Sequence, residues 1–312
     1  MKRSPGIHAR ASEANPLQPT MKRSLFLLAS LLVASALVHA QATAAWRAMN
    51  QPVEPYRIAG NLFYVGASDI ASYLIATPEG DILLDGGFVE TAPLIESSIR
   101  KLGFKLTDVK VLLNSHAHLD HAGGLAELKR ATGARLFASE REAPLLARGG
   151  KGDPYFADRA TFPPIQADHT LRDGDTVTLG GTTLTAHLTP GHTRGDTTWT
   201  MKVKEGDRTY DVVFAGSASI LAEGILTRNA AYPEIAADYA RTFRVLEALP
   251  CDIFLGSHAS FFDGLGKAKR LREGAKANPF VDPQGYRDYV ARSEKAYREE
   301  MRREGSEAPQ RP

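Results

Sequence analysis

The chain has 312 residues, of which 43% are hydrophobic and 24% charged, and this composition excludes a disordered, collagen-like or coiled-coil protein. Its length accommodates one large domain or two medium ones. The formal net charge of +2 gives no reason to expect a nucleic-acid partner, and the single cysteine, Cys251, excludes internal disulfides, four-cysteine zinc modules and iron–sulfur clusters.

The first 40 residues have the pattern of a secretory signal peptide behind a short extension. Met21-Lys22-Arg23 is a basic start, residues 25–37 are apolar or small, and Val38-His39-Ala40 matches a small-x-small cleavage site. A membrane anchor is the alternative, but this run of thirteen residues falls short of the roughly 20 that span a bilayer. We therefore expect the leader to be removed, which leaves no membrane anchor.

Removal of residues 1–40 defines the mature chain. Cleavage after Ala40 would leave a single domain over residues 41–312, secreted across the inner membrane into the periplasm, and Met21 is a candidate for the true start. The leader holds five of the 38 basic and one of the 36 acidic residues, so the mature chain has a net charge of −2. No linker or low-complexity tract divides it, and we expect a monomer.

Short apolar runs alternate with amphipathic segments throughout the mature chain, a pattern typical of strands flanked by helices. Strands are expected at residues 62–65, 73–76, 82–84, 109–113, 176–179, 182–188, 197–203, 211–215 and 252–255. Helices are expected at residues 93–102, 125–131, 235–249 and 265–303. The strands nearest the N-terminus predict a meander, and the whole pattern predicts two packed sheets with helices on the outside.

Four potential metal ligands within six residues follow the predicted strand at 109–113. Alternate residues of an extended chain point the same way, so His116 and His118 can bind one ion. Asp120 and His121 lie on the turn into the next helix, where they can reach a second ion. Imidazole and carboxylate groups are ligands that suit zinc. Their close spacing therefore favours a zinc site over the alternative that these are solvated loop side chains.

Two more histidines follow predicted strands. His192 ends the motif Thr189-Pro190-Gly191-His192, and His258 ends Gly256-Ser257-His258. Loops at strand ends commonly present catalytic ligands on a rigid scaffold, so we expect both histidines to join the cluster. His187, within a strand, and His169, in a loop, are not expected to join it.

The six ligands divide into two sites of three, each with an open position, as in catalytic rather than structural zinc sites. Two such ions about 3.5–4 Å apart can share a bridging water and lower its pKa enough to supply hydroxide. We therefore predict two zinc ions per chain and hydrolase chemistry. The first ion is assigned to His116, His118 and His192, and the second to Asp120, His121 and His258.

These motifs resemble the metallo-β-lactamase superfamily, on three features: His-x-His-x-Asp-His from His116 to His121, Thr-Pro-Gly-His ending at His192, and the late His258. The resemblance implies an α+β fold, a four-layer αββα sandwich with a dinuclear metal site at one edge of the sheets. The superfamily also includes glyoxalase II, lactonases and nucleases, so the fold alone does not decide the function.

Ser217 and His121 narrow the resemblance. In the glyoxalase, lactonase and nuclease branches, the strand end that reads Gly216-Ser217 here usually carries an aspartate that bridges the two metals. Serine at this position together with His121 resembles the third subclass of class B β-lactamases, and the similarity extends over most of the mature chain. Arg194, where a proline is frequent, and the unpaired Cys251 depart from relatives without replacing a predicted ligand.

The resemblance implies a zinc-dependent β-lactamase that opens the lactam ring of a small-molecule substrate with a zinc-bound hydroxide and so confers resistance to β-lactam antibiotics. Asp120 would orient the hydroxide, and Ser217 and Ser219 would hydrogen-bond the substrate carboxylate. Residues 149–162, rich in glycine and aromatic side chains, are expected to form a loop over the site. The alternatives are a secreted dizinc hydrolase of a lactone or another ester, and a non-catalytic zinc-binding protein.

Overall fold

The computed structural model of the chain describes Met1 and residues 44–221 and 226–306. The predicted signal peptide, residues 1–40, lies outside the described residues and stays a prediction. The chain divides into two units, Met1–Ala48 and Met49–Pro312, and every element named below belongs to the second unit. No helix in the described part of the chain combines the length and the apolar character needed to cross a membrane.

Strands from the first half of the chain form a seven-stranded sheet. Its members are β1 (Tyr56–Ala59), β2 (Leu62–Tyr64), β3 (Tyr73–Thr77), β4 (Gly80–Leu84), β5 (Val109–Leu113), β6 (Arg135–Ser139) and β7 (His169–Leu171). They lie in sequence order, antiparallel from β1 to β4 and parallel from β4 to β7. The carboxyl ends of β4, β5 and β6 therefore meet at one edge of the sheet.

Strands from the second half form a five-stranded sheet. Its members are β8 (Thr176–Leu179), β9 (Thr182–Leu188), β10 (Thr197–Glu205), β11 (Arg208–Ala215) and β12 (Ile253–Gly256). The order is β12-β11-β10-β9-β8, and only β11 and β12 run parallel. Gly180 and Gly181 connect β8 to β9 with φ of +51° and +81°, which glycine adopts without steric cost. Because β9 and β11 are both antiparallel to β10, the carboxyl ends of β9, β11 and β12 share one edge.

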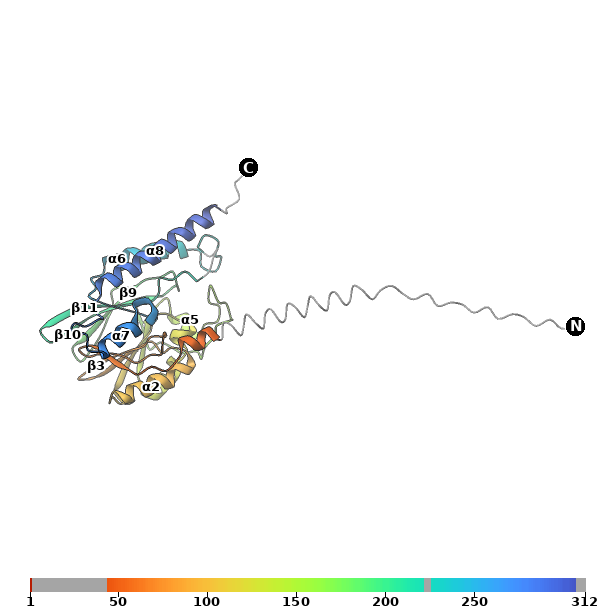
Figure 1. The fold of residues 1–312 in the computed structure, drawn as a ribbon. Coiled ribbons are helices and arrows are strands. Elements are labelled where there is room, and N and C mark those ends of the chain that lie inside the picture. The colour runs from red at the N-terminus through yellow and green to blue at the C-terminus, as the bar shows by residue number, and fades with distance from the viewer. Residues whose placement is uncertain (2–43, 222–225, 307–312) are drawn as a thin grey trace. The chain divides into compact units, whose positions relative to one another are not determined.

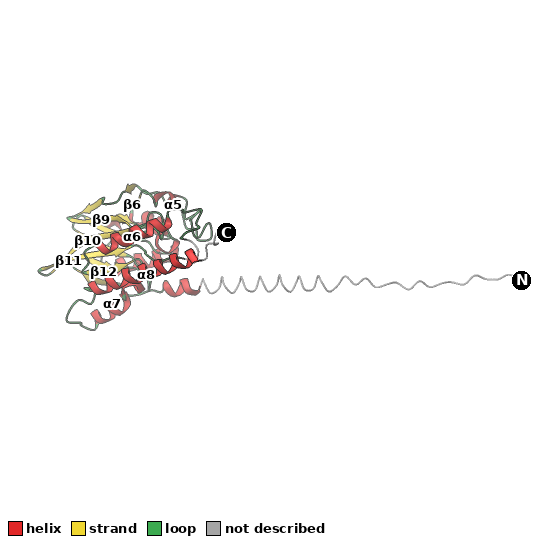
Figure 2. Cartoon of the chain, turned by 90° about the horizontal axis from the view of Figure 1, so that it is seen from above, coloured by secondary structure: helices red, strands yellow, loops and turns green. Residues whose placement is uncertain are grey.

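Helices cover the outer face of each sheet (Figure 1 and Figure 2). Those on the first sheet are α2 (Ala92–Lys101) and α4 (Leu125–Thr132), and those on the second are α6 (Ile235–Ala248) and α8 (Pro283–Ser306). The shorter helices are α3 (Leu119–Ala122), α5 (Ala143–Ala147) and α7 (Gly264–Arg272). Single 3-10 turns occur at Val89–Thr91, Leu106–Asp108 and Ala259–Phe262.

The alternation of side chains along β3 explains the layers. Tyr73 and Ile75 belong to the core between the sheets, whereas Leu74 belongs to the core beneath α2 and α4. The ring of Tyr73 meets that of Phe214 from β11 edge-on, with centroids 5.1 Å apart, and Trp199 of β10 is fully buried in the same core. Two sheets packed face to face with helices outside confirm the αββα sandwich implied by the resemblance.

Most predicted elements are present, and the differences have a physical reason. Strands β5, β8 and β9 have the expected bounds, and β2, β3 and β4 form the expected meander. The sequence pattern does not predict β1, β6 and β7, which pair with β2, β5 and β6 respectively. His169 begins β7 rather than lying in a loop, because it pairs with Phe137 of β6. The helical region expected at 265–303 is divided into α7 and α8.

Candidate metal centre

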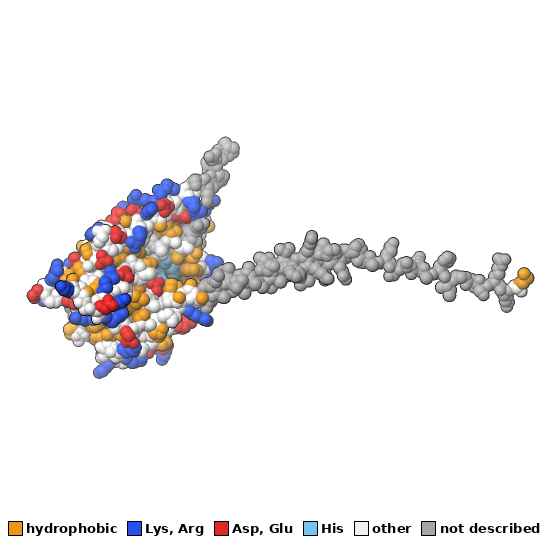
Figure 3. All heavy atoms as spheres, in the orientation of Figure 1, with side chains coloured by type: hydrophobic (Ala, Val, Ile, Leu, Met, Phe, Trp, Pro, Cys, Tyr) orange, Lys and Arg blue, Asp and Glu red, His pale blue; other side chains and the backbone are white. Residues whose placement is uncertain are grey.

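The loops that follow β5, β9 and β12, and helix α3 after the first of these loops, converge at the edge of the sandwich. They bring together all six side chains predicted to bind metal, in the two predicted groups, and the ligand atoms of each group lie within 4.8 Å of one another. The first group is His116, His118 and His192, and the second is Asp120, His121 and His258. On the face drawn in Figure 3, acidic and basic side chains are interspersed, and histidine atoms reach the surface toward the right-hand side of the coloured body.

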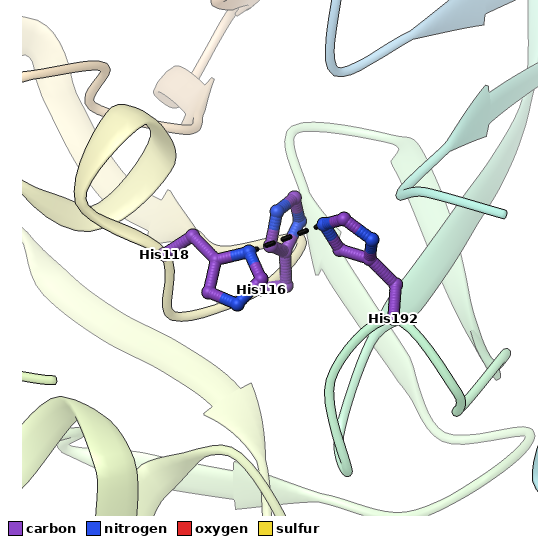
Figure 4. Close-up of side chains that lie close together, drawn as sticks. All are labelled: His116, His118 and His192. Atoms are coloured by element: carbon purple, nitrogen blue, oxygen red, sulfur yellow. Dashed lines mark hydrogen bonds between the residues drawn. The ribbon is translucent and has the colours of Figure 1, made fainter. Parts of the chain in front are cut away.

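The first group consists of three imidazoles (Figure 4). His118 Nδ1 and His192 Nε2 face each other at 3.1 Å, and the ring of His116 lies 5.0 Å from that of His118 and 4.8 Å from that of His192. His116 is 1% exposed, and its Nε2 has no hydrogen-bond partner. Burial lowers the pKa of His116 and of His192, and so do the neighbouring histidines, which favours the neutral ring that binds a metal. An unpaired buried nitrogen beside two further imidazoles fits zinc.

The second group adds a carboxylate. His121 Nε2 and His258 Nε2 are 3.2 Å apart, and Asp120 Oδ2 lies 3.5 Å from the first of these nitrogens and 3.7 Å from the second. Burial would raise the pKa of Asp120, but His121 and His258 outweigh it and hold the pKa well below its usual range, so the carboxyl is ionised. The rings of His116 and His121 are 4.3 Å apart, which places the two groups side by side.

Two of the ligand histidines have their outward-facing nitrogen held by an oxygen. His258 Nδ1 lies 2.9 Å from Asp69 Oδ2, and His192 Nδ1 lies 2.9 Å from the backbone carbonyl of Ser219. Burial lowers the pKa of His258, but the hydrogen bond to Asp69 and the charge of Asp120 raise it above its usual value. Oxygen partners of this kind fix the ring so that the opposite nitrogen can face a metal.

The segment at residues 149–162 contacts the site, as the sequence predicts. Asp153 accepts the backbone N–H groups of Tyr155 and Phe156 at 2.8 and 2.6 Å, and its Oδ2 lies 3.5 Å from His118 Nε2. The ring of Phe156 meets that of His118 edge-on, with centroids 5.0 Å apart. One carboxylate thus shapes this loop and holds a predicted metal ligand.

Three acids are buried close to the ligand loops. Asp85, Glu142 and Asp196 are 2%, 1% and 0% exposed, and burial raises the pKa of all three. Asp85 accepts the backbone N–H of Ser115 at 2.7 Å, and Glu142 accepts that of Ala117 at 2.6 Å. Buried acids are costly unless positive charge offsets them, and a pair of cations at the adjacent site would do so.

The two serines predicted to contact substrate lie next to His192. Ser217 follows β11 and is 4% exposed, and its Oγ lies 2.9 Å from Ser219 Oγ. Ser219 Oγ is 3.3 Å from His192 Nδ1, and the carbonyl of Ser219 accepts the hydroxyl of Tyr239 at 2.7 Å. The structure therefore places both hydroxyls beside the first group of ligands.

Sequence reasoning does not find Asp69, Asp153 or Asp196. Each lies in a loop and has no motif of its own, and Asp69 meets His258 across 189 positions of the chain. Positional hints exist for Asp196, which lies four residues after His192, and for Asp153, which lies in the segment at residues 149–162 that the sequence places over the site. All three become partners of a predicted ligand through tertiary contacts alone.

Comparison with known proteins identifies relatives with this architecture. The sequence profile of the Metallo-beta-lactamase superfamily matches residues 65–258. The native FEZ-1 metallo-β-lactamase from Legionella gormanii is 46% identical, with a TM-score of 0.80 over 82% of this chain and 98% of that one. The class B3 di-zinc metallo-β-lactamase LRA-12 from an Alaskan soil metagenome is 40% identical, with a TM-score of 0.77 over 82% and 96%. BJP-1, a subclass B3 metallo-β-lactamase of Bradyrhizobium japonicum, is 38% identical, with a TM-score of 0.78 over 83% and 97%.

Curated proteins with similar sequences bear a different name. A hydroxyacylglutathione hydrolase from Fuscovulum blasticum is 29% identical over 175 residues, which are 56% of each chain. Another, from Rhodopseudomonas palustris strain BisB5, is 35% identical over 126 residues, 40% of this chain and 41% of that one. The chain thus spans about half the length, or less, of these curated relatives.

Proposed function

The chain belongs to the metallo-β-lactamase superfamily, and from this premise we propose that it is a β-lactamase that binds two zinc ions and acts in the periplasm. The family and the clustered ligands support a metal-dependent hydrolase. What we propose beyond this is a β-lactam substrate, two ions per chain and a periplasmic location. We also propose that the protein is a monomer without a nucleic-acid or membrane partner.

Ser217, which follows β11, is the observation that favours a β-lactam over the other candidate substrates. Ser217, and not a carboxylate, follows Gly216, and its hydroxyl lies 2.9 Å from that of Ser219. Among the described residues, neither group of metal ligands includes a side chain from this loop. Two neutral hydroxyls beside His192 can donate hydrogen bonds to the carboxylate of a β-lactam, whereas an acid at position 217 would repel it.

The extent of similarity to known proteins also favours a β-lactam substrate. FEZ-1 is 46% identical and 98% of its length is matched, whereas the first hydroxyacylglutathione hydrolase is 29% identical over 56% of its length. LRA-12, a class B3 enzyme, and BJP-1, a subclass B3 enzyme, are also matched over nearly their whole length.

The metal groups define the chemistry in this proposal. Zinc, when bound, supplies a Lewis acid for the lactam carbonyl and a water ligand of lowered pKa. The two histidine-rich groups would hold the ions, and Asp120 would contribute one carboxylate oxygen to the second group. The other oxygen of Asp120 can accept a hydrogen bond from the attacking water and so orient it toward the carbonyl.

Other side chains bind the substrate. The hydroxyls of Ser217 and Ser219 donate to its carboxylate, which places the lactam ring over the ligand groups. Phe156, held against His118, offers an apolar surface that excludes water from one side of the site. The reaction then needs no nucleophilic side chain, because the nucleophile is water.

A dizinc hydrolase of a lactone or another ester is the second candidate, favoured by the hydroxyacylglutathione hydrolases among the relatives. We would compare hydrolysis of nitrocefin, an acyl-homoserine lactone and a hydroxyacylglutathione thioester by the zinc-loaded protein. We expect the highest kcat/KM for nitrocefin, with activity lost in EDTA and restored by zinc. A higher kcat/KM for the lactone or the thioester would favour the second candidate, and no turnover of any of them would favour a zinc-binding protein without catalysis.

A further inference from the structure

Asp196 lies behind the first group of ligands and has no part in the function proposed above. It is 0% exposed, its Oδ1 accepts the hydroxyl of Thr189 at 2.9 Å, and its Oδ2 has no hydrogen-bond partner. That second oxygen lies 3.5 Å from Nδ1 of His116. A fully buried carboxyl with an unpaired oxygen costs free energy unless a positive group offsets it.

The surroundings of Asp196 differ from those of the other buried acids. All three acids accept a backbone N–H: Asp85 that of Ser115 at 2.7 Å, Glu142 that of Ala117 at 2.6 Å, and Asp196 that of Ser217. Of these three acids, only Asp196 has a buried oxygen that makes no hydrogen bond. Gly216, which follows β11, leaves space for the carboxyl of Asp196, because a Cβ at Gly216 would overlap Asp196 Oδ1.

We propose that Asp196 is a positioning residue of the metal centre, whose Oδ2 keeps the hydrogen of His116 on Nδ1 so that the lone pair of Nε2 faces the first metal ion. Ser115 Oγ also lies 3.0 Å from this Nδ1, and it can accept the same hydrogen. A carboxylate behind a ligating imidazole fixes its orientation and strengthens it as a ligand. The inference rests on the proposed metal centre and is independent of the β-lactam substrate.

The substitution Asp196→Asn removes the charge and keeps the shape of the side chain. In competition with a chromophoric chelator, we expect one zinc equivalent to bind about 10- to 100-fold more weakly than in the wild type. It should be the equivalent that His192→Ala loses, because His192 and His116 belong to the same group. The melting temperature of the metal-free protein should not fall, because the substitution removes a buried acid with an unpaired oxygen.

Asp81→Asn is the matched control. Asp81 is 3% exposed and also has a carboxylate oxygen without a partner, so the same change of charge is made in a similar environment. Asp81 lies on β4, four residues and roughly 13 Å along the chain before Asp85, and no hydrogen bond or ion pair found among the described residues joins it to a predicted ligand. The zinc affinity of this variant should equal that of the wild type.

Unchanged zinc affinity in Asp196→Asn would overturn the inference. An equal loss of affinity in Asp81→Asn would also overturn it, as would a lower melting temperature of metal-free Asp196→Asn, because the acid would then only support the fold. In each of these cases the wild-type protein still binds zinc. If the wild type binds none, the proposed metal centre fails together with this inference, so the two failures are distinguishable.

Discussion

His192 joins the two parts of the site at the scale of single residues. Its Nε2 faces His118 Nδ1 at 3.1 Å, and its Nδ1 lies 2.9 Å from the carbonyl of Ser219. Ser219 in turn is linked to Ser217 through their hydroxyls, 2.9 Å apart. Metal binding and the proposed substrate contact therefore involve two adjoining loops, the one after β9 and the one after β11, and a substitution that tests one function should leave the backbone of both loops intact.

Ser217→Ala removes one hydroxyl from the loop after β11 and no predicted metal ligand. We expect both zinc ions to remain and KM for β-lactams to rise with little change in kcat, provided that the contact is equally strong in the ground and transition states. A hydrogen bond to a charged group is worth about 1.5–3 kcal/mol, or roughly 10- to 150-fold in kcat/KM. Steady-state kinetics with a penicillin and a cephalosporin, beside zinc analysis, measure this. Unchanged kinetics for every β-lactam would assign the carboxylate contact to Ser219 or to another residue.

At the scale of elements, β4 connects the core of the first sheet to the site. It lies in the middle of the sheet and leads directly to Asp85, which supports the ligand loop. Asp81, at its other end, is 3% exposed. Burial raises the pKa of Asp81 from 3.8 to about 6, although the backbone of Thr77 partly opposes this. An acid in the strand is thus costly to ionise.

The pKa of Asp81 predicts how stability depends on pH. Because the folded value lies above the unfolded value, the folded protein binds this proton more tightly, and the stabilisation is lost as the pH rises through about 6. In urea unfolding of the metal-free protein at about pH 8, Asp81→Asn should be more stable than the wild type by about 1–3 kcal/mol. Near pH 4 the two proteins should be almost equally stable. A gain of the same size at both pH values would show that ionisation is not the cause.

Elements also differ in how far the sequence predicts them. Strand β5 has four buried apolar residues and the exposed Lys110, and polar residues follow it directly, so its bounds follow from the pattern. Strand β7 has three residues with one buried side chain, and it becomes a strand because β6 offers backbone groups to pair with. Pairing of this kind depends on a partner remote in the sequence, which no local periodicity records.

At the scale of the whole molecule, the metal centre links the two sheets. The loop after β5 of the first sheet and the helix α3 that follows it supply four of the six candidate ligands, and loops after β9 and β12 of the second sheet supply the others. An ion held by both halves of the sandwich binds only the folded chain. Metal binding should therefore stabilise the fold as well as supply the chemistry.

Elemental analysis at saturating zinc should give two ions per chain, and His192→Ala and His121→Ala should each weaken a different one. Removal of zinc should lower the melting temperature, since a ligand at 1,000 times its Kd stabilises the folded state by about 4 kcal/mol. Each variant should show part of this loss. A single ion bound by the wild type at saturation would contradict the dinuclear assignment.

The sequence by itself determines the candidate ligands and the fold class. Four of the ligands lie between positions 116 and 121, where spacing along one loop is local information, and the apolar runs of the strands indicate two packed sheets. Only the tertiary structure decides which groups stand behind those ligands. Asp69 contacts His258, which is 189 positions away in the sequence. Asp196, which directly precedes β10 of the second sheet, lies beside His116, which follows β5 of the first sheet. Such pairs depend on which loops meet at the edge of the sandwich, and that meeting results from the packing of the whole chain.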